Sequence, residues 1–242
     1  SSLNKIGIEV VDAKLILEQA RVIKSPEELK CMKAAIDVAE IGVSKMRDEL
    51  KAGMTEDELW SILHKTNIEH GGEWIECRIL SSGVRTNPWM QESSNKIIQS
   101  GEIVSFDTDM VGPYGYCADI SRTYVEGNKF SESQKKLYLM AVEQINHNSR
   151  LIKPGISFKE FTQKSWVLPE EYFGNRYSVM VHGIGLCDEW PAIRYPADGG
   201  ERSGVFETNM TITVESYIGK VGGKEGVKLE QQYLVGQNSL EL

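Results

Sequence analysis

The stretch SFDTDMVGPYGYCADISRT, residues 105–123, gathers three aspartates around one predicted turn. Asp107 and Asp109 are two residues apart, so on a strand both side chains point to the same face. GPYG at 112–115 predicts the turn, and the returning strand brings Asp119 back toward the first two. Three like charges on one sheet face repel one another and are costly to bury unless a cation compensates them. The stretch therefore indicates a metal-binding hairpin, with a solvated acidic strand face as the alternative.

Two more carboxylates and one histidine extend this pattern. Glu215 in TITVESYIG and Glu230 in GVKLEQQYLV each lie inside an otherwise apolar strand pattern. His182 follows the strand-like YSVMV, and Gly183 and Gly185 beside it allow a close backbone approach. A single histidine is more often a core residue than a ligand, but these flanks favour a ligand. One imidazole with four or five carboxylates forms an oxygen-rich set that suits iron, manganese or zinc, as two bridged ions about 3.5–4 Å apart.

Helical and strand patterns follow one another in blocks along the chain. Ser25 with Glu28 predicts a capping box that starts a helix ending at Gly53. Further helices are predicted to begin at Thr55, Ser131 and Ser157. Strands are predicted within 102–110, 114–127, 210–219 and 226–236. This order predicts an α+β domain with helices over an antiparallel sheet.

The bulk composition narrows the possible partners. The chain has 242 residues and a formal net charge of −8, which disfavours nucleic-acid binding because that needs clustered Lys and Arg. The four cysteines are far apart and predict reduced thiols in a cytoplasmic setting. No apolar run approaches the roughly 18 residues that a membrane-spanning helix needs. We expect a cytoplasmic protein that binds a small molecule and neither nucleic acid nor a membrane.

The ordered set Asp…Asp, His-Gly-Ile-Gly-Leu, Glu, Glu resembles the methionine aminopeptidase, prolidase and creatinase family, which has the pita-bread fold. The motifs YGYCADISRTY, VESYIG and GVKLEQQYLV carry the resemblance, which extends from Ser25 over nearly the whole remaining chain. It implies an α+β fold with a curved antiparallel sheet covered by helices on its outer face. It also implies a homodimer and a metal-binding catalytic domain at 25–242. Residues 1–24 are then expected to be a linker or the remnant of a missing N-terminal domain.

Carried over by position, the resemblance implies a ligand set for two divalent ions. The ligands are Asp109, Asp119, His182, Glu215 and Glu230. Asp107 joins them because the hairpin spacing departs from the family. Asp119 follows Asp109 by ten residues and Asp107 by twelve, where the peptidases usually show eleven. Either aspartate, or both, can therefore be a ligand.

The turn HGIGLCDEWP, residues 182–191, departs from the hydrolytic members of the family. Those peptidases continue this turn into a second histidine and carry another one before the first aspartate. Here Asp188 occupies the turn, and residues 81–95 contain no histidine. Such histidines donate hydrogen bonds to the developing oxyanion, whereas an aspartate with an ordinary pKa of about 3.9 is anionic at pH 7 and can only accept a proton. Asp188 is therefore predicted to be a general base, and peptide hydrolysis is disfavoured.

The altered turn, SSGVRTNPW and FDTD resemble the dimethylsulfoniopropionate lyase branch of this fold, which is associated with iron. The resemblance implies a metal-dependent carbon–sulfur lyase that cleaves this small zwitterion to dimethyl sulfide and acrylate by β-elimination. Two transition-metal ions are implied, with iron favoured over manganese or zinc. A sulfonium group is expected to contact aromatic faces through cation–π attraction. The candidates are Tyr177 first, then Trp89, Tyr172, Phe173 and Trp190. Arg122 is expected to orient the substrate carboxylate or to support a ligand.

Two other functions share these features. A metallopeptidase of the Xaa-Pro dipeptidase or aminopeptidase P type would use every proposed ligand, but it would also need the missing histidines. A non-catalytic pita-bread binding module would usually have lost ligands, whereas this chain keeps the full set. The lyase is therefore favoured over both.

Overall fold

The computed structural model of the chain describes residues 2–199 and 203–241. The helices are α1 (Lys14–Arg21), α2 (Pro26–Glu49), α3 (Glu56–Glu69), α4 (Glu132–Leu151), α5 (Phe158–Lys164) and α6 (Glu170–Phe173). The first six strands are β1 (Trp74–Ile75), β2 (Leu80–Ser82), β3 (Ile103–Asp107), β4 (Met110–Val111), β5 (Cys117–Ala118) and β6 (Ser121–Val125). The others are β7 (Val179–Ile184), β8 (Asp188–Arg194), β9 (Thr211–Gly219), β10 (Gly226–Val235) and β11 (Leu240–Glu241).

Side-chain caps start four of these helices. The Ser25 hydroxyl accepts a hydrogen bond from the Glu28 amide, and the Glu28 carboxylate accepts one from the Ser25 amide, so the predicted capping box is formed. Thr55 and Ser131 start α3 and α4 with capping boxes of their own, and Ser157 caps α5. A cap satisfies backbone amides that have no partner within the helix. The four predicted helix starts are therefore confirmed.

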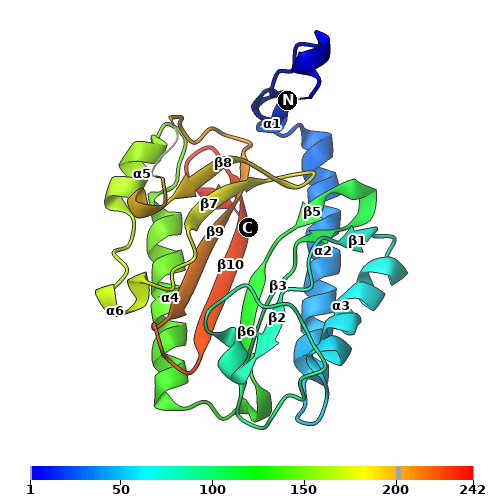
Figure 1. Cartoon of the computed structure of the whole chain (residues 1–242), viewed down its shortest axis with the longest axis vertical. Coiled ribbons are helices and arrows are strands. Elements are labelled where there is room, and N and C mark those ends of the chain that lie inside the picture. The colour runs from blue at the N-terminus through cyan, green and yellow to red at the C-terminus, as the bar shows by residue number, and fades with distance from the viewer. Residues whose placement is uncertain (1, 200–202, 242) are drawn as a thin grey trace.

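The two largest hydrophobic clusters lie mainly in an N-terminal half (residues 26–125) and a C-terminal half (residues 131–235), with Val22 and Ile103 packing in the second cluster. In the N-terminal half, α2 and α3 pack against the strands through residues such as Ala39, Leu63 and Phe106. In the C-terminal half, α4 and α5 pack against β7, β9 and β10 through a second buried cluster. Figure 1 shows α2 and α3 on one outer side and α4 on the other, with the strands between them.

Every strand pair in the described residues is antiparallel, as predicted, but hydrogen bonding divides the strands into three sheets. Their orders are β1-β4-β5, β2-β3-β6 and β11-β10-β9-β7-β8. β6 and β10 meet at the seam between the halves. They belong to different sheets, and hydrogen bonds from a side chain on β6 to the backbone of β10 connect them. The Thr123 hydroxyl donates to the Lys228 carbonyl at 2.7 Å and accepts from the Lys228 amide at 3.2 Å. The seam thus brings strands of both halves side by side.

The N-terminal segment, residues 2–24, contains a helix that the sequence patterns do not predict. The apolar side chains of Leu15, Ile16 and Leu17 on α1 are exposed, whereas Glu18 within α1 and Val22 and Lys24 after it are buried. Figure 1 shows this segment projecting from one end of the molecule. None of the helices in the described residues is long and apolar enough to cross a membrane.

Candidate metal centre

The six predicted ligands come from both halves and converge at the seam. Asp107 ends β3, Asp109 follows in the connection to β4, and Asp119 lies between β5 and β6. His182 lies on β7, Glu215 on β9 and Glu230 on β10. The register of the strand ladders brings His182, Glu215 and Glu230 to one face of the sheet. Glu215 pairs with Glu230, and His182 pairs with Thr213, which lies two residues from Glu215 on the same strand face.

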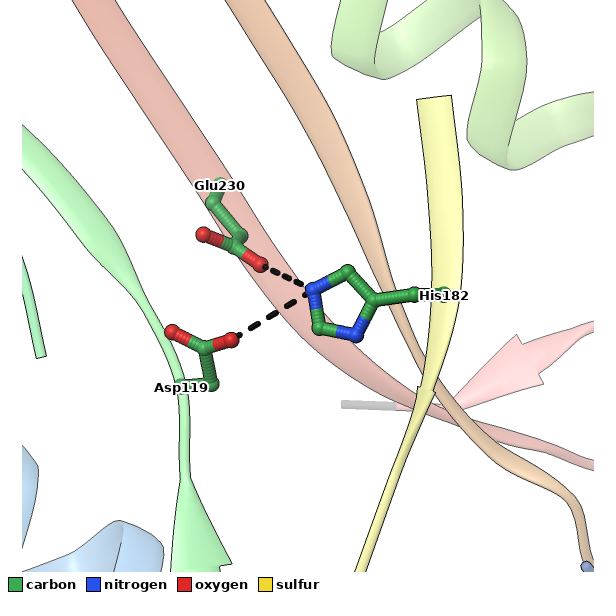
Figure 2. A group of neighbouring side chains, drawn as sticks. All are labelled: Asp119, His182 and Glu230. Atoms are coloured by element: carbon green, nitrogen blue, oxygen red, sulfur yellow. Dashed lines mark ion pairs between the residues drawn. The ribbon is translucent and has the colours of Figure 1, made fainter. Parts of the chain in front are cut away.

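Figure 2 shows His182 pointing its Nε2 atom at the carboxylates of Asp119 and Glu230. Nε2 lies 3.5 Å from Asp119 Oδ2, 3.3 Å from Glu230 Oε1 and 3.2 Å from Glu215 Oε1. The other ring nitrogen, Nδ1, donates to the Gly183 carbonyl at 2.9 Å. Because a carbonyl can only accept, this bond fixes the ring and leaves Nε2 facing the carboxylates. Asp119, His182 and Glu230 offer donor atoms that all lie within 4.8 Å of one another.

A buried lysine that the sequence patterns do not single out lies among these carboxylates. Lys228 Nζ donates to Asp107 Oδ2 and Glu230 Oε2 at 2.9 Å each. It also donates to Ser121 Oγ at 2.6 Å and lies 2.8 Å from Glu215 Oε2. Lys228 precedes Glu230 by two residues on β10, so strand alternation places both on one face. That spacing was the signal in the sequence that could have found it.

Burial and like charge raise the pKa values of the aspartates in the cluster. Burial, and then the charge of Glu230, raise the pKa of Asp107 to about 7, although Lys228 opposes the shift. Burial and the neighbouring carboxylates raise the pKa values of Asp109 and Asp119 well above their ordinary range. Burial alone would also raise the pKa of Glu230, but the Lys228 charge lowers it well below its usual range. The cluster as a whole therefore lacks compensating positive charge.

The unpartnered atoms and the charge balance of the cluster fit two divalent metal ions. Asp107 Oδ1 and Asp119 Oδ1 are buried and have no hydrogen-bond partner among the described residues. Leaving such atoms unpaired is costly, and a cation would satisfy them. When all five carboxylates of the ligand set are ionised, they carry five negative charges, which two divalent ions together with Lys228 would balance. Carboxylates with one imidazole suit iron, manganese or zinc, whereas a structural zinc site would favour cysteine.

Asp188 lies at the edge of the cluster, with its side chain 56% exposed. Its Oδ1 atom is 3.7 Å from His182 Nδ1. Asp188 also forms a group with Asp109 and Asp119 in which one donor atom of each lies within 4.8 Å of the others. This placement suits a base that faces a substrate at the centre, and it equally suits an additional metal ligand.

Close contacts require both glycines after His182. A Cβ atom at Gly183 would lie 2.3 Å from the Trp190 carbonyl oxygen, and one at Gly185 would lie 2.7 Å from Glu189 Oε2. The β7–β8 ladder also shifts register between His182 and Gly183. The tight turn that presents both His182 and Asp188 therefore depends on residues without side chains at these positions.

Two of the predicted aromatic residues lie beside the cluster. Lys228 Nζ is 5.5 Å from the centroid of the Trp89 ring and 5.2 Å from that of Tyr177. The two rings share a small hydrophobic cluster with Ile79 and Tyr217. Both rings therefore already take part in cation–π contacts with Lys228 beside the cluster.

A buried carboxylate anchors the loop that carries Trp89. Glu56 accepts hydrogen bonds from the amide and hydroxyl of Ser82 and from the hydroxyl of Ser94, all at 2.8 Å, and it pairs with Arg85. Such a fully bonded buried charge holds its partners in one geometry. The loop 82–94 is thereby fixed against α3.

The structure places the other aromatic candidates in the core of the C-terminal half. The Trp190 ring lies edge-on to Phe158 at 5.3 Å, and Tyr172 and Phe173 belong to the same hydrophobic core. Trp190 is partly buried against this core, and its contact with a substrate stays a prediction. Strand position alone could not distinguish a core ring from a ring at the site.

Arg122 supports a ligand strand. Its guanidinium donates to the Glu230 carbonyl and to Gln231 Oε1, both at 2.7 Å. These contacts tie β6 to β10 beside Glu230. Of the two predicted roles for Arg122, the structure favours support of a ligand over contact with the substrate carboxylate.

An α+β domain with outer helices, and with acidic and imidazole donors meeting between its halves, is the architecture of the pita-bread fold. The sequence profile of metallopeptidase family M24 matches residues 30–237, so the chain belongs to this family. The Xaa-Pro dipeptidase from Bacillus anthracis shares the fold, with a TM-score of 0.85 and 26% sequence identity over 99% of this chain and 67% of that one. The predicted fold is therefore confirmed.

Two curated relatives show where the chain lies within the family. Dimethylsulfoniopropionate lyase DddP of Roseovarius nubinhibens is 41% identical over 99% of this chain. The Xaa-Pro dipeptidase of Pyrococcus horikoshii is 30% identical over 92% of this chain and 62% of its own length. The chain spans 56% of the length of the Roseovarius lyase.

Proposed function

We propose that this chain is the catalytic part of a metal-dependent lyase that cleaves dimethylsulfoniopropionate to dimethyl sulfide and acrylate. The observation that carries the proposal is the carboxyl group of Asp188 at the edge of the candidate metal centre, 3.7 Å from His182. The 41% identity to a lyase, against 30% to a dipeptidase, supports the same choice.

The six predicted ligands would hold the two ions, and we propose iron. They are Asp107, Asp109, Asp119, His182, Glu215 and Glu230. When bound, the ions would supply a Lewis-acidic site for the substrate carboxylate and stabilise the negative charge that develops beside it on deprotonation. Lys228 pairs with one oxygen each of Asp107, Glu215 and Glu230, so its positive charge offsets part of the repulsion among these carboxylates.

Asp188 supplies the base in the proposed step. Its carboxylate takes the proton from the carbon next to the substrate carboxylate. The electron pair of that C–H bond forms the double bond of acrylate. The C–S bond breaks, and its electron pair leaves on sulfur as neutral dimethyl sulfide. Asp188 then returns its proton to water, which its exposed side chain permits.

Trp89 and Tyr177 would receive the sulfonium end of the substrate. Their rings flank the acidic cluster from the side of Lys228. Aromatic faces attract a cation without placing a strong base beside it. We further propose that the protein works in the cytoplasm as a homodimer on this small zwitterion, without a nucleic-acid or membrane partner.

Xaa-Pro peptide hydrolysis is the second candidate, because the dipeptidase relatives share the fold and the family. Its oxyanion would need a hydrogen-bond donor in the turn after His182. The side chain in that position is Asp188, and a carboxylate accepts hydrogen bonds and does not donate them. Elimination is therefore favoured over hydrolysis.

One assay separates the possibilities. The purified chain is loaded with Fe²⁺, Mn²⁺ or Zn²⁺ and given dimethylsulfoniopropionate or an Xaa-Pro dipeptide, with and without chelator. Acrylate and dimethyl sulfide that appear only with metal support the lyase. Proline release without acrylate would assign the peptidase, and a metal-loaded protein inert to both would point to a binding module.

A further inference from the structure

A buried ion-pair cluster lies directly behind Asp188. Glu189 has a side chain 0% exposed, and its Oε1 atom accepts a hydrogen bond from Arg21 Nε at 2.9 Å. Its Oε2 atom accepts one from Lys24 Nζ at 3.0 Å, and the Lys24 side chain is only 2% exposed. A buried carboxylate with two cationic donors is held in one place, since moving it would leave buried charges unpaired.

The same carboxylate fastens the β7–β8 turn. Glu189 Oε1 also accepts a hydrogen bond from the Leu186 amide at 3.1 Å. Glu189 Oε2 lies so close to Gly185 that a Cβ atom there would approach it to 2.7 Å. Arg21 Nη2 reaches Cys187 Sγ at 3.9 Å. The turn at 185–187 is thus tied to the N-terminal segment through one side chain.

Asp188 and Glu189 are consecutive on β8 and therefore point to opposite faces of the strand. Glu189 is fixed in the interior, while Asp188 is turned to the metal cluster. Among the described residues, Asp188 accepts no hydrogen bond that would hold it from its own side. The position of the Asp188 side chain is therefore set by the backbone of β8, which Glu189 holds in place.

We propose that Glu189, held by Arg21 and Lys24, is a positioning residue that keeps Asp188 in place as the base. The inference rests on the proposed function, because it concerns the base of that elimination. Arg21 and Lys24 precede residues 30–237, which the family profile matches. A segment outside the family profile therefore supports the reacting group.

The test compares single variants of the whole chain. Lys24→Met removes the buried charge and keeps the aliphatic stem, Lys24→Arg keeps the charge, and Lys14→Met is the control because Lys14 is 79% exposed and pairs with Glu18. Glu189→Gln, which loses the charge but keeps the shape, is made as a second probe. The readouts are metal content, kcat and KM for acrylate release, and hydrogen–deuterium exchange in peptides covering 183–190.

Lys24→Met is expected to keep its metal and its KM and to lose at least about tenfold in kcat, because a small displacement of a reacting group is costly. Exchange in 183–190 is expected to speed up about tenfold, while Lys24→Arg and Lys14→Met stay near wild type. Unchanged exchange would overturn the proposal, and so would faster exchange with unchanged kcat. If the wild type releases no acrylate, the proposed function fails, while exchange still decides whether Lys24 and Glu189 fix the turn.

Discussion

Glu215 and Glu230 are direct partners across the β9–β10 ladder, and the Lys228 ammonium lies 2.8 Å and 2.9 Å from their Oε2 atoms. Like charges directly opposite each other destabilise a strand pair. Lys228 provides the compensation that allows the pair to be buried. Its removal should therefore be felt mainly when no metal is present.

We expect Lys228→Met to lower the free energy of unfolding of the metal-free protein by about 3–5 kcal/mol, the usual cost of leaving buried charges unpaired. Metal loading is expected to recover part of this loss, since the ions also neutralise the carboxylates. Urea denaturation with and without metal measures both. Lys220→Met is the control, because Lys220 is 58% exposed and pairs with Glu171, so it should cost less than about 1 kcal/mol. Equal effects of the two substitutions would contradict the burial argument.

The metal-free protein is expected to lose stability as the pH rises. Burial and neighbouring charge raise the pKa of Asp107 to about 7. Proton binding at Asp107 therefore stabilises the folded protein fully below the ordinary pKa of an aspartate, and this stabilisation is lost as the pH rises from about 4 to about 7. Burial lowers the pKa of His182, but hydrogen bonds to Glu215 and Glu230 outweigh this and raise it well above its ordinary range, so its contribution is also lost on the alkaline side.

Thermal denaturation between pH 5.5 and pH 8 checks this dependence, with pH values chosen above the range of ordinary carboxylates. The Tm of the chelated protein should fall across this range, and the rise in Tm on adding metal should grow, because metal ions compete with protons for the same donors. A chelated protein whose Tm rises over this interval would show that the cluster does not hold protons as described.

Asp188→Asn is expected to keep bound metal and to lower kcat for acrylate release by about 10²–10⁴-fold, the usual contribution of a general base. Metal analysis and steady-state kinetics measure the two effects. The control is Asp37→Asn on α2, because Asp37 is 54% exposed and forms a surface ion pair with Lys33. Loss of metal from Asp188→Asn would instead make Asp188 a ligand, in line with its closeness to Asp109 and Asp119.

Tyr177→Leu is expected to raise KM for dimethylsulfoniopropionate by about 2- to 30-fold, because a cation–π contact contributes about 0.5–2 kcal/mol. Tyr177→Phe keeps the aromatic face and should stay near wild type. If both variants bind substrate equally weakly, the Tyr177 hydroxyl and not the ring would be the contact. Binding of acrylate, which has no cationic end, should be unchanged in both.

The sequence predicts the parts of this fold that depend on neighbours in the chain. Ser25, Thr55, Ser131 and Ser157 mark helix starts because a cap bonds to an amide two or three residues away. The helix α1 is missed because its apolar residues are exposed and because Arg21, at its end, is tied to Glu189, 168 residues away. Contacts over such separations leave no local pattern.

The candidate site likewise combines features that the sequence predicts with features that depend on residues far apart in the chain. Its donors could be named through resemblance, but strand alternation does not place Asp107 and Asp109 as predicted, because β3 ends at Asp107 and Asp109 lies outside a strand with a φ of 36°. Lys228 was missed although its spacing from Glu230 placed it on the same face, because a lysine on a strand is usually solvated. The sequence does not show which way the Trp190 ring points, because its direction depends on packing against Phe158, which is not a neighbour in the chain.

The equal division of donors between the halves limits how this centre could be recombined. A crossover in the connection at 126–131 would keep most of each large core within one parent, although Val22 and Ile103 pack with the C-terminal core. Neither parent would bring a whole coordination sphere, because Asp107, Asp109 and Asp119 lie on one side and His182, Glu215 and Glu230 on the other. A chimera could therefore pack well and still bind metal poorly, unless both parents place their strands across the junction in the same register.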